Sequence, residues 1–150
     1  MKQTLAYLAS PYSDTDPAVQ HRRYLDACDA AAALMARGRM VLSPIAHTHP
    51  IARRGALPTG FDFWQRFDRR LIAACDELWV LRIDGWRESV GVRAEIAIAR
   101  ELGKPVRLVY PRRPCERCGE VYAASSRGLW KHVCAQRLPE MQPERVEAVA

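Results

Sequence analysis

Short apolar runs alternate with longer amphipathic stretches along the first 110 residues of the chain. The runs at 4–10, 40–44, 77–83 and 105–110 have the length and composition of buried strands. Between them, apolar residues recur at helical spacing over 17–37, 61–76 and 92–102. This alternation predicts an α/β, Rossmann-like (flavodoxin-like) domain, in which a parallel sheet carries helices on both faces.

Capping residues set the expected boundaries of these elements. Asp16 and Pro17 are placed as N-cap and first residue of the first helix, and Gly38 follows its end. Residues 45–60, IAHTHPIARRGALPTG, are expected to form a loop whose length suggests a function. The helix over 61–76 gathers its apolar residues on one face: Phe63, Phe67, Leu71 and Ala74.

The composition fits one globular domain with a small appendage. The chain has 150 residues, of which 49% are hydrophobic and 27% charged. We expect the α/β domain at 1–110, an appendage at 111–136 and a flexible tail at 137–150. No apolar run approaches the roughly 18 residues of a membrane span, and the N-terminus does not resemble a signal peptide. The sequence therefore predicts a cytoplasmic protein without a membrane partner.

The net charge of +6 raises the question of a nucleic-acid partner. The basic residues are spread along the chain, and no stripe of Lys and Arg interleaved with aromatic residues is present. Nucleic-acid binding stays open but is not favoured. The positive charge agrees better with a small phosphorylated ligand.

Three expected loops, 10–16, 44–60 and 84–91, follow strands of the predicted sheet. Ligands of open parallel sheets bind beyond the carboxyl ends of the strands. Ser89 and Gly91 also lie at the start of a helix, where free backbone N–H groups favour an anion, although Ser89 is equally suited to a plain N-cap. The candidate ligand-binding residues in these segments are Ser10, Tyr12, Ser13, His47, Asp84, Trp86, Ser89 and Gly91.

Glu95 is the unusual residue of the last helix. It stands among Val92, Ala94, Ile96 and Ile98, although a carboxylate in apolar surroundings is costly unless it is paired or reactive. A salt bridge to a neighbouring arginine is the simpler explanation of its position. Asp68 lies in a segment rich in arginine, where most aspartates are solvated surface charges. Asp84 ends a predicted strand, where turn formation alone would explain an aspartate.

Together these residues give the chain a resemblance to the nucleoside 2-deoxyribosyltransferase superfamily, which includes deoxynucleoside monophosphate N-glycosidases. It is most similar to a bacterial and phage branch without an assigned activity. The resemblance covers roughly residues 4–110. It is carried by YLASPYS, by an aspartate eight residues before Asp76, by the pattern Ser-x-Gly-x-x-x-Glu from Ser89, and by the Gly-Lys-Pro after the helix.

The resemblance implies an N-glycosidase in which Glu95 is the nucleophile and Tyr7 orients it. Asp68 is the implied acid near the base, with Asp84 as the alternative, and Ser89 contacts a phosphate or sugar hydroxyl. Two carboxyl groups of this kind fit the chemistry of glycoside cleavage. Water as acceptor makes the enzyme a hydrolase, and a second base makes it a deoxyribosyltransferase. The resemblance implies no catalytic cofactor and at least a homodimer.

The chain departs from the resembling family in its first loop. Phosphate-specific members carry an arginine where this chain has Ser13, so the phosphate requirement stays open; Arg22, Arg23, Arg87 and Arg93 are the candidate replacements. Trp86 and Trp64 are candidates for stacking on a base, or for simple packing. His47 and His49 are candidates to reach the base, and no carboxylate accompanies them to complete a metal site.

Two other functions compete with the glycosidase. One is a module that senses a nucleotide without turnover, or whose tail tethers the chain to nucleic acid. The other is hydrolysis of a dinucleotide such as NAD, which would use the same glutamate. Glu95 favours an enzyme, because a carboxylate beside a phosphate site does not help a pure binder of anions.

The C-terminal segment contains a candidate structural zinc site. Cys115 and Cys118 form a Cys-x-x-Cys-Gly motif, and His132 and Cys134 follow it. Four such ligands suit tetrahedral zinc, although the His-x-Cys half is more tightly spaced than usual. The alternative is a set of free thiols in a reducing compartment.

Overall fold

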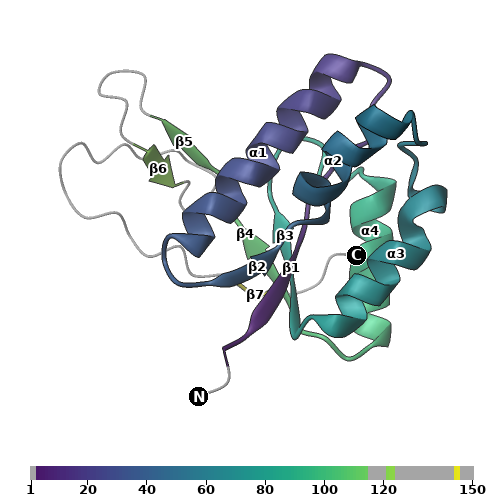
Figure 1. The fold of residues 1–150 in the computed structure, drawn as a ribbon. Coiled ribbons are helices and arrows are strands. Elements are labelled where there is room, and N and C mark those ends of the chain that lie inside the picture. The colour runs from purple at the N-terminus through teal and green to yellow at the C-terminus, as the bar shows by residue number, and fades with distance from the viewer. Residues whose placement is uncertain (1–2, 115–120, 124–143, 146–150) are drawn as a thin grey trace.

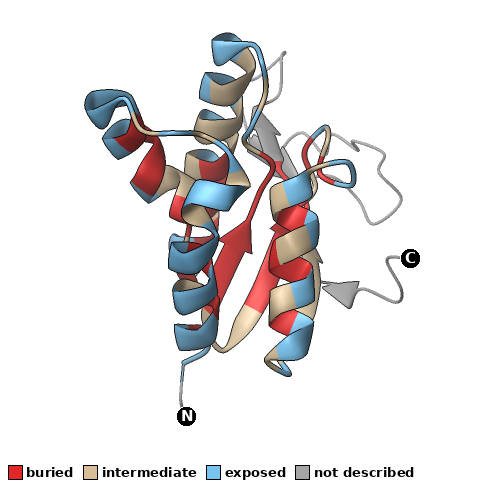
Figure 2. Ribbon diagram, turned by 90° about the vertical axis from the view of Figure 1, so that its right-hand side faces the viewer, coloured by how far each residue is buried: buried red, intermediate tan, exposed pale blue. Residues whose placement is uncertain are grey.

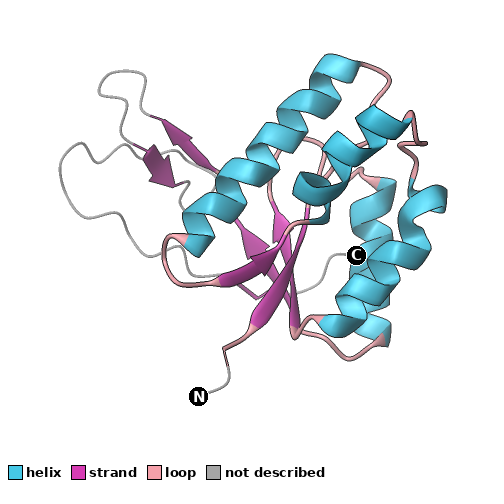
Figure 3. Ribbon diagram, viewed as in Figure 1, coloured by secondary structure: helices cyan, strands magenta, loops and turns pink. Residues whose placement is uncertain are grey.

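The four strands expected from the sequence form one sheet in a computed structural model that describes residues 3–114, 121–123 and 144–145 (Figure 1). The order along the chain is β1 (Leu5–Ala9), α1 (Pro17–Met35), β2 (Met40–Leu42), α2 (Pro44–Gly55), α3 (Phe61–Ala74), β3 (Glu77–Leu81), α4 (Val90–Glu101) and β4 (Val106–Val109). Figure 3 shows the helices packed around these strands. The predicted α/β, Rossmann-like architecture is confirmed.

The order of the strands in the sheet is β2-β1-β3-β4, and all four are parallel. From β1 the chain moves outward to β2 on one side, and β3 and β4 then extend the sheet on the other side. The connections therefore reverse direction between β1 and β3. In open α/β sheets this reversal opens a crevice at the carboxyl ends of the two strands, which is the usual place for a ligand.

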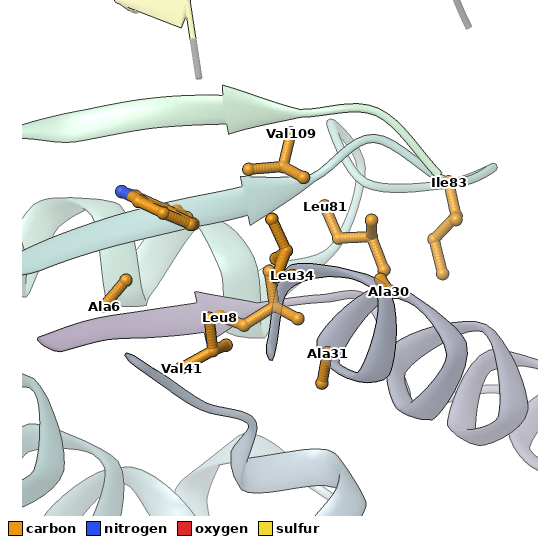
Figure 4. Close-up of a cluster of buried hydrophobic side chains, with 10 residues drawn as sticks. Ala6, Leu8, Ala30, Ala31, Leu34, Val41, Leu81, Ile83 and Val109 are labelled. Atoms are coloured by element: carbon orange, nitrogen blue, oxygen red, sulfur yellow. The ribbon is translucent and has the colours of Figure 1, made fainter. Parts of the chain in front are cut away.

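Each face of the sheet has its own apolar core. Alternate residues of β1 point to opposite faces, so Leu8 belongs to one core and Tyr7 to the other. Helix α1 covers the first core, where Leu34 packs near Leu8 and Leu81 (Figure 4). Helices α3 and α4 cover the second core. Figure 2 shows the buried strands between helices whose outer surfaces are exposed.

The start of α1 is as predicted, because the Asp16 side chain accepts from the N–H of Ala18 at 2.8 Å and Pro17 is the first helical residue. The loop expected over 45–60 is wrong, since most of it is helix α2. Ser43 caps this helix by accepting from the N–H of Ala46. Pro50 lies inside α2, and an internal proline ordinarily ends a helix.

Of the four residues on the expected apolar face of α3, only Leu71 packs against the core. Phe63 is 50% exposed and Phe67 38% exposed, whereas Asp68 and Ile72 are the buried residues of this helix. Helix α3 therefore turns a carboxylate inward and leaves two aromatic rings outside. Such an inversion of the hydrophobic pattern is expected at a functional site rather than in a passive core.

Two short strands of the predicted appendage and one of the predicted tail are described. β5 (Arg112–Pro114) pairs antiparallel with β6 (Val121–Ala123), and β7 (Glu144–Arg145) pairs antiparallel with β4. The candidate zinc ligands Cys115, Cys118, His132 and Cys134 lie outside the described residues. In the described part of the chain, no helix is long and apolar enough to cross a membrane.

Candidate active site

A pocket of about 450 Å³ lies where β1 and β3 end, at the reversal of the strand order. Its walls come from the loop after β1, from α1 and α2, from the start of α3, and from the segment 85–91 that leads into α4. A volume of this size is within the range of about 300–1,000 Å³ that is typical of small-molecule sites.

The most buried polar contact at the pocket joins Tyr7 to Glu95. Tyr7 is fully buried in the middle of β1, and its hydroxyl donates to Oε1 of Glu95 at 2.6 Å. Glu95 lies in the second turn of α4, lines the pocket and is only 6% exposed. It makes no ion pair with an arginine among the described residues. The salt-bridge explanation of Glu95 is therefore wrong.

Asp68 joins the same group from α3. It is 7% exposed and lines the pocket. Burial raises the pKa of Asp68 to about 6, against the lowering effect of a hydrogen bond to Tyr7. Burial also raises the pKa of Glu95 to about 8, the Tyr7 hydrogen bond lowers it, and the Asp68 charge raises it. Burial and both carboxylates hold the pKa of Tyr7 well above its usual value.

The two carboxyl groups therefore hold one proton between them in the range between about pH 6 and 8. One of the two is then an acid and the other a carboxylate, and Tyr7 contacts both. In the empty pocket, burial favours the proton on Glu95. Coupled pairs of this kind are a mark of acid–base sites.

The N-terminus of α4 forms another part of the pocket wall. Ser89 is the N-cap, and its hydroxyl accepts from the N–H of Val92 at 3.3 Å. Ser89, Val90 and Gly91 all line the pocket. The first backbone N–H groups of a helix and its dipole favour an anion there. Ser89 is thus a cap and a pocket residue at once.

Arg23 brings a positive charge to this wall from α1. It alone of Arg22, Arg23, Arg87 and Arg93 lines the pocket, and the other three are exposed. The Arg23 side chain donates to the carbonyl of Ser13 at 2.7 Å, and Asp14 lies 3.5 Å away. Its Nη2 lies against Gly85, where a Cβ would be only 2.8 Å from it, and Gly85 has φ +83°.

The first loop adds polar groups from Ser10, Tyr12 and Ser13, which all line the pocket as expected. The Ser10 hydroxyl is buried and has no hydrogen-bond partner among the described residues. Ser13 donates to the carbonyl of Thr59 at 2.8 Å and so ties this loop to the segment before α3. An unpaired buried hydroxyl costs free energy unless a ligand or water completes it.

Three expected ligand-binding residues do not line the pocket. His47 is exposed and stacks on Phe67, with ring centroids 6.2 Å apart. Asp84 is exposed in the turn after β3. Trp86 is buried in the core with Tyr7, and the guanidinium groups of Arg82 and Arg87 lie over its ring. Trp86 is therefore a packing residue of the second core and does not line the pocket.

Of the candidates to reach or stack on a base, His49 and Trp64 line the pocket. The structure adds Thr48 and Ala52 from α2 and Phe61 from α3, which the sequence did not single out. Trp64 donates through Nε1 to the carbonyl of Pro58, which fixes the indole at the rim. The Ser43-Pro44 pair was the available signal for α2, since a capping residue followed by proline starts helices.

No group of three or more His, Cys, Asp or Glu side chains is placed to hold a metal ion within the described ranges. His49 is in the pocket and His47 is outside it, because residues two apart on a helix point in different directions.

The comparison with known proteins agrees with the extent of the α/β domain. No curated protein sequence matches the chain. Residues 4–111 match a family described as a domain of unknown function, DUF1937, and this segment contains the whole parallel sheet and every pocket residue. The match spans well over half of the chain, and the protein therefore belongs to the DUF1937 family.

Proposed function

We propose that this protein is an N-glycosidase that cleaves the bond between base and sugar of a (deoxy)nucleoside 5′-monophosphate. The observation that carries the proposal is the buried Tyr7–Glu95 hydrogen bond, with Asp68 beside it, in a pocket at the reversal of the strand order. The resemblance to the nucleoside 2-deoxyribosyltransferase superfamily supports it, because that resemblance assigns the same three residues to catalysis.

In the proposed reaction, substrate binding moves the proton of the pair from Glu95 to Asp68, and a carboxylate oxygen of Glu95 then attacks the anomeric carbon while the bond to the base breaks. The bonding electrons leave with the base, and positive charge builds on the sugar. This charge and the Tyr7 hydrogen bond both favour the ionised form of Glu95, which burial opposes in the empty pocket. Asp68 assists the departing base by a hydrogen bond or a proton. Water then releases the sugar from Glu95.

Two features of the pocket wall that attract anions support a phosphorylated substrate, in a wall that also contains Asp62 and Glu88. Arg23 and the start of α4 both line the pocket, and both attract an anion. The unpaired hydroxyl of Ser10 offers a further hydrogen bond. Arg23 thus takes the role that the first-loop arginine has in the resembling family. A pocket of about 450 Å³ also suits a mononucleotide better than a dinucleotide such as NAD.

A second candidate is a nucleotide sensor without turnover. The observation that favours it is the raised pKa of Glu95, because a protonated Glu95 binds a ligand as a hydrogen-bond donor and cannot attack it. Deoxyribosyl transfer differs from hydrolysis only in the acceptor. The three functions share one pocket and are separated by their products.

The test is release of free base, followed by chromatography, from nucleosides, deoxynucleosides, their 5′-monophosphates and NAD, with and without an acceptor base. Glu95→Gln is compared with wild type, and Glu101→Gln is the matched control, since Glu101 lies on the same helix but is exposed. We expect base release by wild type and Glu101→Gln, and a loss of at least ~1,000-fold in Glu95→Gln.

Three results would redirect the proposal. A new nucleoside formed from the acceptor base identifies a transferase. Equal release by wild type and Glu95→Gln removes Glu95 from catalysis. Tight nucleotide binding without release by any folded variant favours the sensor.

A further inference from the structure

Tyr12, His49 and His21 form a chain of polar contacts that begins at the pocket. The Tyr12 hydroxyl lies 2.7 Å from Nδ1 of His49, and Nε2 of His49 lies 3.5 Å from Nδ1 of His21. Tyr12 and His49 both line the pocket, whereas His21 is exposed on α1. The chain therefore runs from the pocket to solvent.

Neighbouring rings hold His49 in this position. His49 lies on α2, and its side chain is only 4% exposed. The Tyr24 ring stacks on it with centroids 4.2 Å apart, and the Tyr12 ring meets it edge-on at 5.6 Å. Both ring nitrogens of the buried His49 imidazole face a polar partner, so this side chain is held in one orientation and connects Tyr12 to His21.

Such a link can pass a proton in either direction. Burial, the neighbouring His21 and the positive charge of Arg53 all lower the pKa of His49, so its ring is neutral at neutral pH. A neutral imidazole has one N–H donor and one acceptor nitrogen. His49 can therefore take a proton at Nε2 from His21 while it gives the proton on Nδ1 to Tyr12.

We propose that Tyr12 donates a proton to the departing base and that His49 and His21 restore this proton from solvent, a role that rests on the proposed function. The Tyr12 O–H bond breaks as an N–H bond forms on the base, which receives the electrons of the glycosidic bond. The proton on Nδ1 of His49 then moves to Tyr12, the proton on Nδ1 of His21 moves to Nε2 of His49, and water protonates Nε2 of His21. Both imidazoles are then in the opposite tautomer. They return to the starting tautomers after the base has left, when a pocket water protonates Nδ1 of His49, the proton on Nε2 of His49 returns to Nδ1 of His21, and the proton on Nε2 of His21 goes to solvent. One proton from water thus leaves with each base.

With Tyr12 as the acid, Asp68 does not have to donate a proton to the base and also set the charge beside Glu95. Asp68 is coupled to Glu95 through Tyr7, so a proton taken from it changes the charge of the nucleophile's surroundings. The Tyr12–His49–His21 chain ends at an exposed residue and has its own supply of protons. Asp68 then acts as a hydrogen-bond partner, and Tyr12 is the catalytic acid, with His49 as its positioning and relaying residue.

The test compares two leaving groups in the same variants. One substrate is the best nucleotide found by base release, and the other carries the same sugar and phosphate with 4-nitrophenol, which departs without a proton. We expect Tyr12→Phe to lose ~100-fold in kcat on the nucleotide, as for loss of a general acid, but less than ~3-fold on the nitrophenyl compound. Tyr110→Phe, which removes the hydroxyl of a tyrosine that does not line the pocket, is the matched control and is expected to match wild type on both.

His49→Asn tests the relay itself. The asparagine amide can keep a hydrogen bond to Tyr12 but cannot pass a proton, so we expect at least a ~10-fold loss in kcat on the nucleotide with little change in KM. Full kcat in His49→Asn would overturn the relay, and equal losses of Tyr12→Phe on both substrates would overturn the acid role. If wild type releases neither leaving group, the glycosidase proposal itself fails, and circular dichroism confirms that each variant is folded.

Discussion

The burial of Glu95 predicts that this residue lowers the stability of the protein at neutral and alkaline pH. In the unfolded chain its pKa is near the usual value of 4.5, and burial raises it to about 8 in the folded protein. Between these values the unfolded chain loses the proton while the folded protein keeps it. The contribution of Glu95 to stability is therefore complete below about pH 4.5 and is lost as the pH rises toward 8.

The size of the effect follows from the same two values. Each pKa unit corresponds to about 1.4 kcal/mol, so the difference amounts to about 5 kcal/mol above pH 8. We regard this figure as an upper bound, because relaxation and water around a buried carboxylate reduce such costs. Total stabilities of domains are about 5–15 kcal/mol, so even half of this amount is easily measured.

The assay is urea unfolding of wild type and Glu95→Gln at pH 5, 7 and 8.5. Glutamine has the shape of the protonated acid and cannot ionise, so the two proteins should differ little at pH 5. At pH 8.5 the variant should be more stable by ~2–5 kcal/mol. Glu101→Gln serves as control, because Glu101 is exposed and pairs with Arg69 on the surface, and it should show no gain. A Glu95→Gln variant that is less stable than wild type at every pH would refute the reasoning and make Glu95 a structural residue.

Four further predictions concern the same pocket and the tail. Arg23→Gln should raise KM for a 5′-monophosphate by ~10–100-fold without affecting a free nucleoside, whereas the exposed neighbour Arg22→Gln should leave both unchanged in the base-release assay. Base release should rise as the pH passes about 6, because the two pocket carboxyl groups then lose their first proton and Glu95 can act as the nucleophile; a rate that is as fast at pH 4.5 as at pH 7 would contradict this. Ser89→Ala should lower the free energy of unfolding by ~0.5–2 kcal/mol through loss of the cap on α4, as measured by urea titration. If the appendage at 111–136 binds structural zinc, elemental analysis should find one zinc per chain in wild type, and Cys115→Ser or Cys118→Ser should lose it.

Much of the fold is readable from the sequence, because apolar periodicity and capping residues act locally. The strands at 4–10 and 77–83 and the cap at Asp16 are examples. Helix α2 escaped notice since Pro50 is unfavourable inside a helix, and only its tertiary setting reveals that it is tolerated there. Local signals describe preferences, and packing against α1 overrides them.

Some residues of the candidate site can also be recognised from the sequence, whereas others depend on how the helices pack. Glu95 is visible in the sequence because a carboxylate among apolar residues is costly. Asp68 is found only through the family resemblance, since its neighbours include arginines and only the register of α3 against α4 turns it inward. The choice of Arg23 among four arginines, and of His49 over His47, depends on which helix face meets the pocket. No spacing rule contains that information, because it is set by contacts between distant elements.

The pairing of β7 with β4 has a consequence for the behaviour of the protein in concentrated solution. Without β7, β4 would be the outer strand of the sheet, with a row of backbone groups free to bind another chain. The opposite edge, β2, has only three residues and offers a short template. Glu144 and Arg145 cover Arg107 and Leu108 of this longer edge, and we expect this pairing to hinder aggregation through it. A chain that ends at Pro111 would keep the pocket but lose this protection.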